Sequence, residues 1–175
     1  MPRLKEAQIR LTKYYETVIR NASEIFDQEG RSMMDALSSI RMEKENIRLC
    51  CRWLEKHYFF DEVNSLLCSV YNGVGEKIFR YIFHCSERVN WLHSAVQASI
   101  RIKNREAESA HLNNLGLVYL DLGEIRKSIS FFEKAISIDQ ELGRKEEGLG
   151  KVLANLGIAH ALLGNNTSAM SFFEQ

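Results

Sequence analysis

The C-terminal half of the chain contains one residue pattern twice, and this internal repeat restricts the possible folds more than any other feature of the sequence. Ten residues of the first copy recur with the same identity 41 positions later, in residues 153–174. In the first copy they are Leu112, Asn114, Leu115, Gly116, Leu122, Gly123, Ser130, Phe131, Phe132 and Glu133. Self-similarity at a fixed period of about 20 to 50 residues is typical of stacked structural units. The sequence therefore predicts an array of similar units.

Two glycines in each copy indicate that the unit is a helix, a turn and a second helix. Gly116 and Gly157 fall inside predicted helices, where glycine costs about 1 kcal/mol relative to alanine. We expect that the missing side chain lets the partner helix come close. Gly123 and Gly164 follow where the first helix of each unit should end in a left-handed cap. A phenylalanine on each second helix is expected to fill the groove between units (Phe132 and Phe173).

The rest of the sequence also predicts helices, so the expected fold class is all-α. Apolar residues recur at steps of three, four or seven, no segment alternates with period two, and Pro2 is the only proline. A capping box at Ser32 to Asp35 should open the second helix. The helices expected before the repeat cover residues 4–30, 32–57, 61–70, 76–85 and 87–103, with a turn at 72–75.

The repeated pattern resembles the tetratricopeptide repeat family. The resemblance rests on Leu112, Leu115, Gly116, Tyr119, Ser128, Phe132 and Ala135, and on Leu153, Leu156, Gly157, His160, Ala169 and Phe173. The unit is 41 residues long, whereas the family unit usually has 34. Two further departures are Gln140, where a proline often closes the unit, and His160, which stands in a position that is usually aromatic. The longer form is similar to the repeats of kinesin light chains and of many bacterial regulators.

This resemblance implies a right-handed superhelix of antiparallel helix pairs and a division of the chain. Residues 1–75 are expected to form an irregular helical region, and residues 76–175 the repeats. Within the repeats we expect a degenerate copy at 76–105, a regular copy at 107–143 and a truncated copy at 147–175. The stretch Glu87 to Ile100 matches a second helix, with Ala95 in the position of Ala135.

The resemblance also implies a binding surface, because the first helices of such units line a concave groove. The residues predicted for peptide binding there are Asn113, Asn114, Leu117, Asp121, Lys151, Asn155 and Ile158. Asn114 and Asn155 hold equivalent positions, and an asparagine amide can pair with a peptide backbone as donor and as acceptor. The alternative is that asparagine simply tolerates a hydrated helix face. The predicted function is a scaffold that binds a protein or peptide.

A second, weaker resemblance concerns the N-terminal helices. Residues 36–57 are similar to the helical stretch that follows the nucleotide-binding module in NB-ARC-type signalling ATPases of the STAND class. The residues that carry it are Leu37, Glu43, Glu45, Asn46, Arg48 and Trp53. It implies an alternative function, the regulatory sensor arm of a nucleotide-driven switch. No phosphate-binding Gly-x-x-x-x-Gly-Lys-Ser/Thr motif occurs in this chain.

Composition and motifs argue against several other classes of protein. Acidic and basic residues cancel, which gives no reason to expect nucleic acid or an anionic membrane as partner, and no apolar run reaches 18 residues. The four cysteines lack zinc-site spacing and are expected to be buried in a reducing, cytoplasmic compartment. No motif supports a catalytic triad, so we expect that the protein is not an enzyme and that it needs no cofactor or metal.

The last unit stops soon after its second helix begins. Phe172 and Phe173 would then face a missing neighbour, although repeat arrays normally end in a helix with a polar outer face. Two interpretations follow. The chain is a piece excised from a longer protein, or it is a scaffold that forms a homodimer through the exposed C-terminal repeat.

Overall fold

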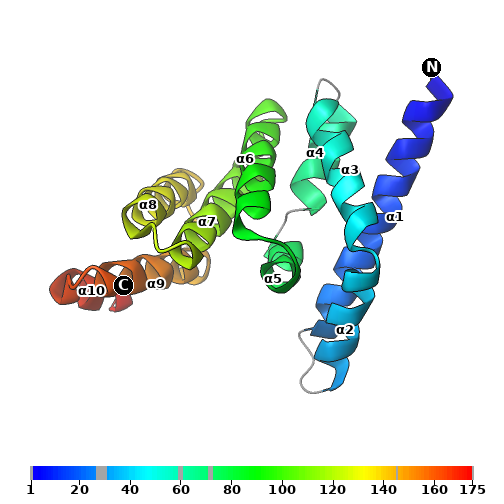
Figure 1. The fold of residues 1–175 in the computed structure, drawn as a ribbon. Helices are drawn as coiled ribbons and strands as arrows, with labels where there is room; N and C mark the ends of the chain where they lie inside the picture. Colours follow the sequence, from blue (N-terminus) through cyan, green and yellow to red (C-terminus); the bar gives the residue numbers. More distant parts are fainter. Residues whose placement is uncertain (1, 27–30, 59–60, 71–72, 145, 175) are drawn as a thin grey trace. The chain divides into compact units, whose positions relative to one another are not determined.

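The computed structural model describes residues 2–26, 31–58, 61–70, 73–144 and 146–174, and these residues fold into helices without a β-strand (Figure 1). The prediction of an all-α fold is confirmed. The helices are α1 (Pro2–Phe26), α2 (Arg31–Met42), α3 (Lys44–Lys56), α4 (Asp61–Val70), α5 (Gly73–Ile82), α6 (Cys85–Arg101), α7 (Arg105–Asp121), α8 (Ile125–Glu141), α9 (Glu146–Leu162) and α10 (Asn166–Phe173). They group into two compact units, Met1–Ile102 and Lys103–Gln175.

The N-terminal unit is built around α1, which packs against α2, α3, α4 and α5. Helix α6 closes the unit by packing mainly against α4. Its core consists of apolar side chains that are almost completely removed from water: Ile19, Ile40, Ile47, Leu54, Val63, Leu67, Ile78, Phe79 and Leu92. Burial of such side chains contributes about 1.5 to 3 kcal/mol each relative to exposure, and it holds these helices together.

The single helix expected for residues 32–57 is wrong, because the structure divides it into α2 and α3 at Glu43. Glu43 leaves the helical conformation with φ −94° and ψ 5°. Its carboxylate accepts a hydrogen bond from the hydroxyl of Tyr15 at 2.9 Å and another from the amide of Asn46 at 2.8 Å. The break therefore coincides with a contact to α1, which the apolar pattern of this segment does not contain.

The expected turn at residues 72–75 is also wrong for its described part. Helix α5 already begins at Gly73 and includes Gly75, whereas the sequence pattern placed its start at Glu76. Glycine is a weak helix former but does not exclude a helix when the rest of the segment packs. The apolar residues that follow supply this packing, since Ile78 and Phe79 are fully buried.

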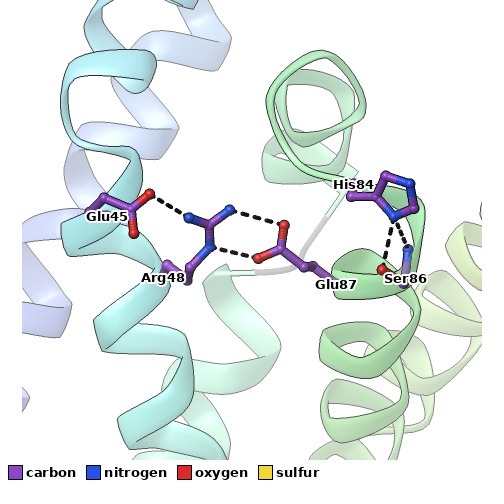
Figure 2. Close-up of polar contacts among 5 residues, drawn as sticks. All are labelled: Glu45, Arg48, His84, Ser86 and Glu87. Atoms are coloured by element: carbon purple, nitrogen blue, oxygen red, sulfur yellow. Dashed lines mark hydrogen bonds and ion pairs between the residues drawn. The ribbon is translucent and has the colours of Figure 1, made fainter.

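An arginine of α3 joins this helix to the first turn of α6. Arg48 donates from Nε and Nη2 to the two carboxylate oxygens of Glu87, at 2.6 and 3.0 Å, and also pairs with Glu45 (Figure 2). The same helix start is capped by His84, whose Nδ1 accepts from the backbone amide of Ser86 at 3.3 Å. This bidentate pair lowers the pKa of Glu87, because Arg48 stabilises its ionised form.

The cysteines of this unit have no disulfide partner. Cys50, Cys51 and Cys68 are buried and Cys85 is half-buried, and all four are free thiols. Burial raises the pKa of the thiols of Cys50 and Cys68. Such thiols are neutral near pH 7 and behave as small apolar residues, as the sequence predicts for the three buried ones.

The C-terminal unit consists of the two predicted copies, α7 with α8 and α9 with α10, and α8 also packs against α9 (Figure 1). The first helix of each pair ends in a left-handed glycine, with φ +74° at Gly123 and +80° at Gly164. The amide that follows each glycine bonds to the carbonyl five residues back, for example Glu124 to Tyr119 at 2.9 Å. This is the Schellman cap, so the expectation of left-handed caps is confirmed.

Gly116 and Gly157, the glycines inside the first helices, have similar surroundings. A Cβ on Gly116 would lie 2.3 Å from the ring of Phe132, and one on Gly157 would lie 2.6 Å from the ring of Phe173. Both rings come from the second helix of the same unit, so the expected close approach is confirmed. The rings therefore pack inside the helix pair; Phe132 is fully buried, whereas Phe173 is 55% exposed.

Candidate functional site

Helical spacing places the predicted binding residues of α7 on one side of that helix. Asn113, Leu117 and Asp121 follow one another at steps of four residues, which brings them close to one line along the helix. Asn113 and Leu117 are half-buried and Asp121 is exposed. Their positions fit a surface that is partly covered by a neighbour and partly open to a ligand.

The neighbour is α9, and an amide pair joins the two first helices. Nδ2 of Asn155 donates to Oδ1 of Asn113 at 2.9 Å. Lys151 and Ile158 lie on the same helix as Asn155, and both are exposed. We call the surface formed by Asn113, Leu117, Asp121, Lys151, Asn155 and Ile158 the α7/α9 face.

The pairing leaves two polar groups on this face without a hydrogen bond among the described residues. They are Nδ2 of Asn113, which is a donor, and Oδ1 of Asn155, which is an acceptor. Each asparagine amide can donate and accept, so a hydrogen bond between two amides uses only part of their capacity. One donor and one acceptor side by side match the N–H and C=O groups of a peptide backbone.

Asn114 lies differently from its equivalent Asn155. Its side chain is only 6% exposed, and its Nδ2 is buried with no hydrogen-bond partner in the described structure. Asn155 is half-buried and bonds to Asn113. Of the predicted asparagines, the structure thus brings Asn113 and Asn155 together, and Asn114 lies in the interior.

The α7/α9 face carries two charged residues of opposite sign. Its two charged residues, Asp121 and Lys151, are exposed, and the last residue of α7 and the early part of α9 carry them. No nucleophile with an adjacent base belongs to this set of residues. The face presents two side-chain amides, a small apolar area and two separated charges of opposite sign.

A cavity in the N-terminal unit was not predicted from the sequence. It is open to solvent on one side, has a volume of about 340 Å³ and is lined by Glu55, Tyr58, Leu67, His93, Ser94, Gln97 and Arg101. A signal for it existed in α6, where His93, Gln97 and Arg101 recur at steps of four residues. Such a polar stripe resembles an ordinary solvated helix face, and only the fold shows that α3 and α4 complete the cavity.

Two further findings concern membranes and metals. In the part of the chain that the structure describes, no helix combines the length and apolar character needed to cross a bilayer. The same residues bring together no cluster of three or more histidine, cysteine, aspartate or glutamate side chains that could hold a metal ion.

Consecutive pairs of antiparallel helices with equivalent residues 41 apart define the C-terminal unit as a helical-repeat structure. The family model described as "Tetratricopeptide repeat" matches residues 92–175, and the predicted resemblance of this region to tetratricopeptide repeats is confirmed. The match begins within α6, so it includes part of the segment predicted as a degenerate copy. Repeats of this family generally serve as protein-interaction scaffolds and are typically not enzymatic.

Two solved structures share the fold at low sequence identity. One is BtubC (BKLC) from P. vanneervenii, with a TM-score of 0.58 and 16% identity over 98% of this chain and 73% of that one. The other is a putative kinesin light chain of nearly identical TPR-like repeats from Podosopora anserina, with a TM-score of 0.53 and 15% identity over 97% and 91%. A comparison with curated proteins gives no match.

These comparisons do not concern the resemblance of the N-terminal helices to NB-ARC-type ATPases, which stays a prediction. The structure gives several of its residues local roles. Arg48 holds Glu87 of α6, and Glu43 accepts hydrogen bonds at the start of α3. Both roles stabilise the N-terminal unit whether or not a nucleotide-driven switch is present.

Proposed function

We propose that this chain is a scaffold module that binds an extended or helical peptide on the α7/α9 face, in a reducing, cytoplasmic compartment. The observation that supports the peptide site most directly is the amide pair of Asn113 and Asn155. It fixes the orientation of both side chains and leaves one donor and one acceptor for a ligand backbone. Leu117 and Ile158 beside the pair supply apolar contact area.

The charges of the face suggest how a peptide is oriented. Asp121 attracts a basic residue and Lys151 an acidic residue, and the two lie at different levels along the helices. Electrostatic complementarity of this kind mainly sets association rate and orientation, whereas the backbone contacts and apolar area hold the ligand. The preferred ligand therefore carries one basic and one acidic residue on either side of a short apolar segment.

The test is selection from a display library of random peptides, followed by calorimetric titration of the enriched sequences. In the Asn113→Ala/Asn155→Ala variant we expect binding about tenfold weaker or worse, because each lost ligand hydrogen bond is worth about 0.5 to 1.5 kcal/mol. Gln140→Ala is the matched control, because Gln140 is an exposed amide on α8 and does not belong to the α7/α9 face. Equal binding by the double variant and the control would rule out the α7/α9 face.

A second candidate, a homo-oligomerising scaffold, is favoured by the surface of the last repeat. Residues 152–173 contain no aspartate, glutamate, lysine or arginine, although the equivalent positions of the first copy hold four charges: Asp121, Glu124, Arg126 and Lys127. Leu162, Met170 and Phe173 are exposed on this uncharged stretch. An interface between identical surfaces avoids like-charge repulsion when the surface carries no charge.

Sedimentation over a range of concentrations tests this candidate. We expect self-association that Leu162→Asp abolishes, since this change places at position 162 the residue found 41 positions earlier. Leu49→Asp is the control, because Leu49 is equally exposed, at 60%, on α3 of the other unit. A monomer at every concentration would exclude the homo-oligomer and would leave the peptide-binding proposal untouched.

A further inference from the structure

The cavity of the N-terminal unit contains two charges of opposite sign that do not neutralise each other. Glu55 comes from α3 and Arg101 from the last turn of α6, and both line the same space of about 340 Å³. No ion pair joins them among the described residues, and Arg101 is not among the groups that shift the pKa of Glu55. The cavity therefore presents a carboxylate and a guanidinium at separate positions.

Arg101 is held in place by an aromatic ring and not by an acid. Its guanidinium carbon lies 4.4 Å from the centre of the Tyr58 ring. In contrast, Arg48 and Arg105 each pair with two carboxylates. Stacking occupies the face of the guanidinium plane and leaves the N–H groups at its edge for a ligand. A carboxylate is the group that matches this edge by forming two parallel hydrogen bonds.

Glu55 is the complementary group. Its carboxylate accepts a hydrogen bond from the hydroxyl of Ser94 at 3.2 Å, and no salt bridge to it is formed among the described residues. Burial raises the pKa of this carboxyl group, while Ser94 and the charge of Arg52 oppose the shift. A carboxylate with one neutral partner in a partly desolvated position is stabilised by a cation that enters the cavity.

We propose that this cavity binds a small zwitterion of the amino-acid or dipeptide class, with its ammonium group at Glu55 and its carboxylate at Arg101. A ligand with one charge would pair with only one of the two protein charges and would leave the other without an ionic partner. The volume is at the lower end of the range for small-molecule sites, about 300 to 1,000 Å³. Gln97 offers an amide to the ligand backbone, and Leu67 forms an apolar wall. The site shares no residue with the α7/α9 face.

The experiment titrates the whole chain with four related probes, followed by calorimetry and by backbone amide chemical shifts. The zwitterions are leucine and the dipeptide Gly-Leu. N-acetyl-Gly-Leu lacks the ammonium group, and Gly-Leu-amide lacks the carboxylate. For the unmodified protein we expect saturable binding of the zwitterions and about tenfold weaker binding of each blocked dipeptide, because each leaves one protein charge unpaired. The shifted amides should belong to α3, α4 and α6.

Variants then assign each ligand charge to its residue. Glu55→Gln should remove the preference for Gly-Leu over N-acetyl-Gly-Leu and keep the preference over Gly-Leu-amide. Arg101→Met should do the opposite, since methionine keeps an unbranched apolar side chain and removes the charged guanidinium group. Arg41→Met, an exposed arginine of α2, is the matched control and should bind like the unmodified protein.

Three results would overturn the proposal. The first is the absence of saturable binding of leucine and Gly-Leu at millimolar concentration. The second is equal affinity for the zwitterions and the blocked dipeptides. The third is tighter binding of N-acetyl-Lys-Glu-amide than of Gly-Leu, which would assign the cavity to neighbouring charged side chains of a protein partner.

Discussion

Replacing Gly116 by alanine tests the physical basis of the repeat, and the same change at Gly157 provides a comparison within one protein. Both glycines lie inside a first helix and face a phenylalanine of the second. On helix propensity alone, alanine should stabilise either position by about 1 kcal/mol. The added methyl group must, however, share its space with a ring.

The two rings differ in burial, and this predicts different outcomes at the two positions. At Gly116 the new Cβ would lie 2.3, 2.5 and 2.8 Å from three ring atoms of Phe132, whereas carbon atoms in contact are about 3.5 to 4.0 Å apart. Phe132 is fully buried, so the ring cannot yield without moving the core. Overpacking of this kind costs about 1 to 3 kcal/mol. After the propensity gain of about 1 kcal/mol is subtracted, we expect Gly116→Ala to lower the free energy of unfolding by up to about 2 kcal/mol.

At Gly157 the contact is nearly as short, 2.6 Å, but Phe173 is 55% exposed and its ring can turn toward water. The propensity gain then roughly offsets the lost ring contact, and we expect a change within about 0.5 kcal/mol. Gly150→Ala is the control without a clash, because nothing lies within 4 Å of its Cβ position in α9. It should stabilise the protein by up to about 1 kcal/mol.

The assay is equilibrium unfolding in urea, followed by far-UV circular dichroism. From the highest to the lowest urea midpoint, we expect Gly150→Ala, then Gly157→Ala, then Gly116→Ala. A double variant, Gly116→Ala with Phe132→Leu, should recover part of the loss, with a coupling energy above about 0.5 kcal/mol. If Gly116→Ala unfolds at the same urea concentration as Gly150→Ala, the close approach of the two helices does not explain this glycine.

Three other predictions each concern the replacement of a single residue. Arg48→Gln should destabilise the protein by about 1.5 to 3 kcal/mol near neutral pH, because the side chains of Arg48 and Glu87 are both largely buried. The pKa of Glu87 is lowered in the folded protein, so the stability that this pair contributes is present above the pKa of the unfolded state and is lost in acid. Urea midpoints measured as a function of pH will show this loss. Burial and the hydrogen bond to Glu43 raise the pKa of Tyr15 to about 12, so the neutral phenol is favoured in the folded state. The stability of the unmodified protein should therefore fall between about pH 10 and 12, and more steeply than the stability of the Tyr15→Phe variant. Thermal unfolding at a series of pH values measures both. Lys103 has φ +55°, a conformation that costs a side-chain residue about 1 kcal/mol or more, so Lys103→Gly should raise the urea midpoint; a lower midpoint would contradict this explanation.

The sequence predicts the C-terminal unit well because equivalent residues meet equivalent neighbours. Gly123 and Gly164 end their helices in the same way, and Gly116 and Gly157 admit the same type of ring. The N-terminal unit lacks this internal comparison. Its helix break at Glu43 coincides with a hydrogen bond from Tyr15, which is 28 positions away. Local periodicity contains no information about such a distant partner.

The same limit applies to the cavity of the N-terminal unit. Glu55 and Arg101 belong to helices that are separated by α4 and α5 in the sequence. Each lies in a pattern that is compatible with a solvated helix face, where a lone charge is ordinary. Only the packing of α6 on α3 and α4 brings both charges to one space. Sequence patterns identify helix faces, but the partner of each face comes from the fold.

The asparagines show how a shift of one position along a helix decides which residue is available for binding. Asn114 and Asn155 are equivalent in the repeat, yet Asn155 bonds to Asn113, which is one position earlier. Successive residues of an α-helix point about 100° apart, so Asn113 and Asn114 cannot both lie on the same exposed face. Asn114 is buried, and its replacement should mainly affect stability. Loss of peptide binding without loss of stability is therefore expected for Asn113→Ala, and the opposite pattern would move the binding surface to another side of α7.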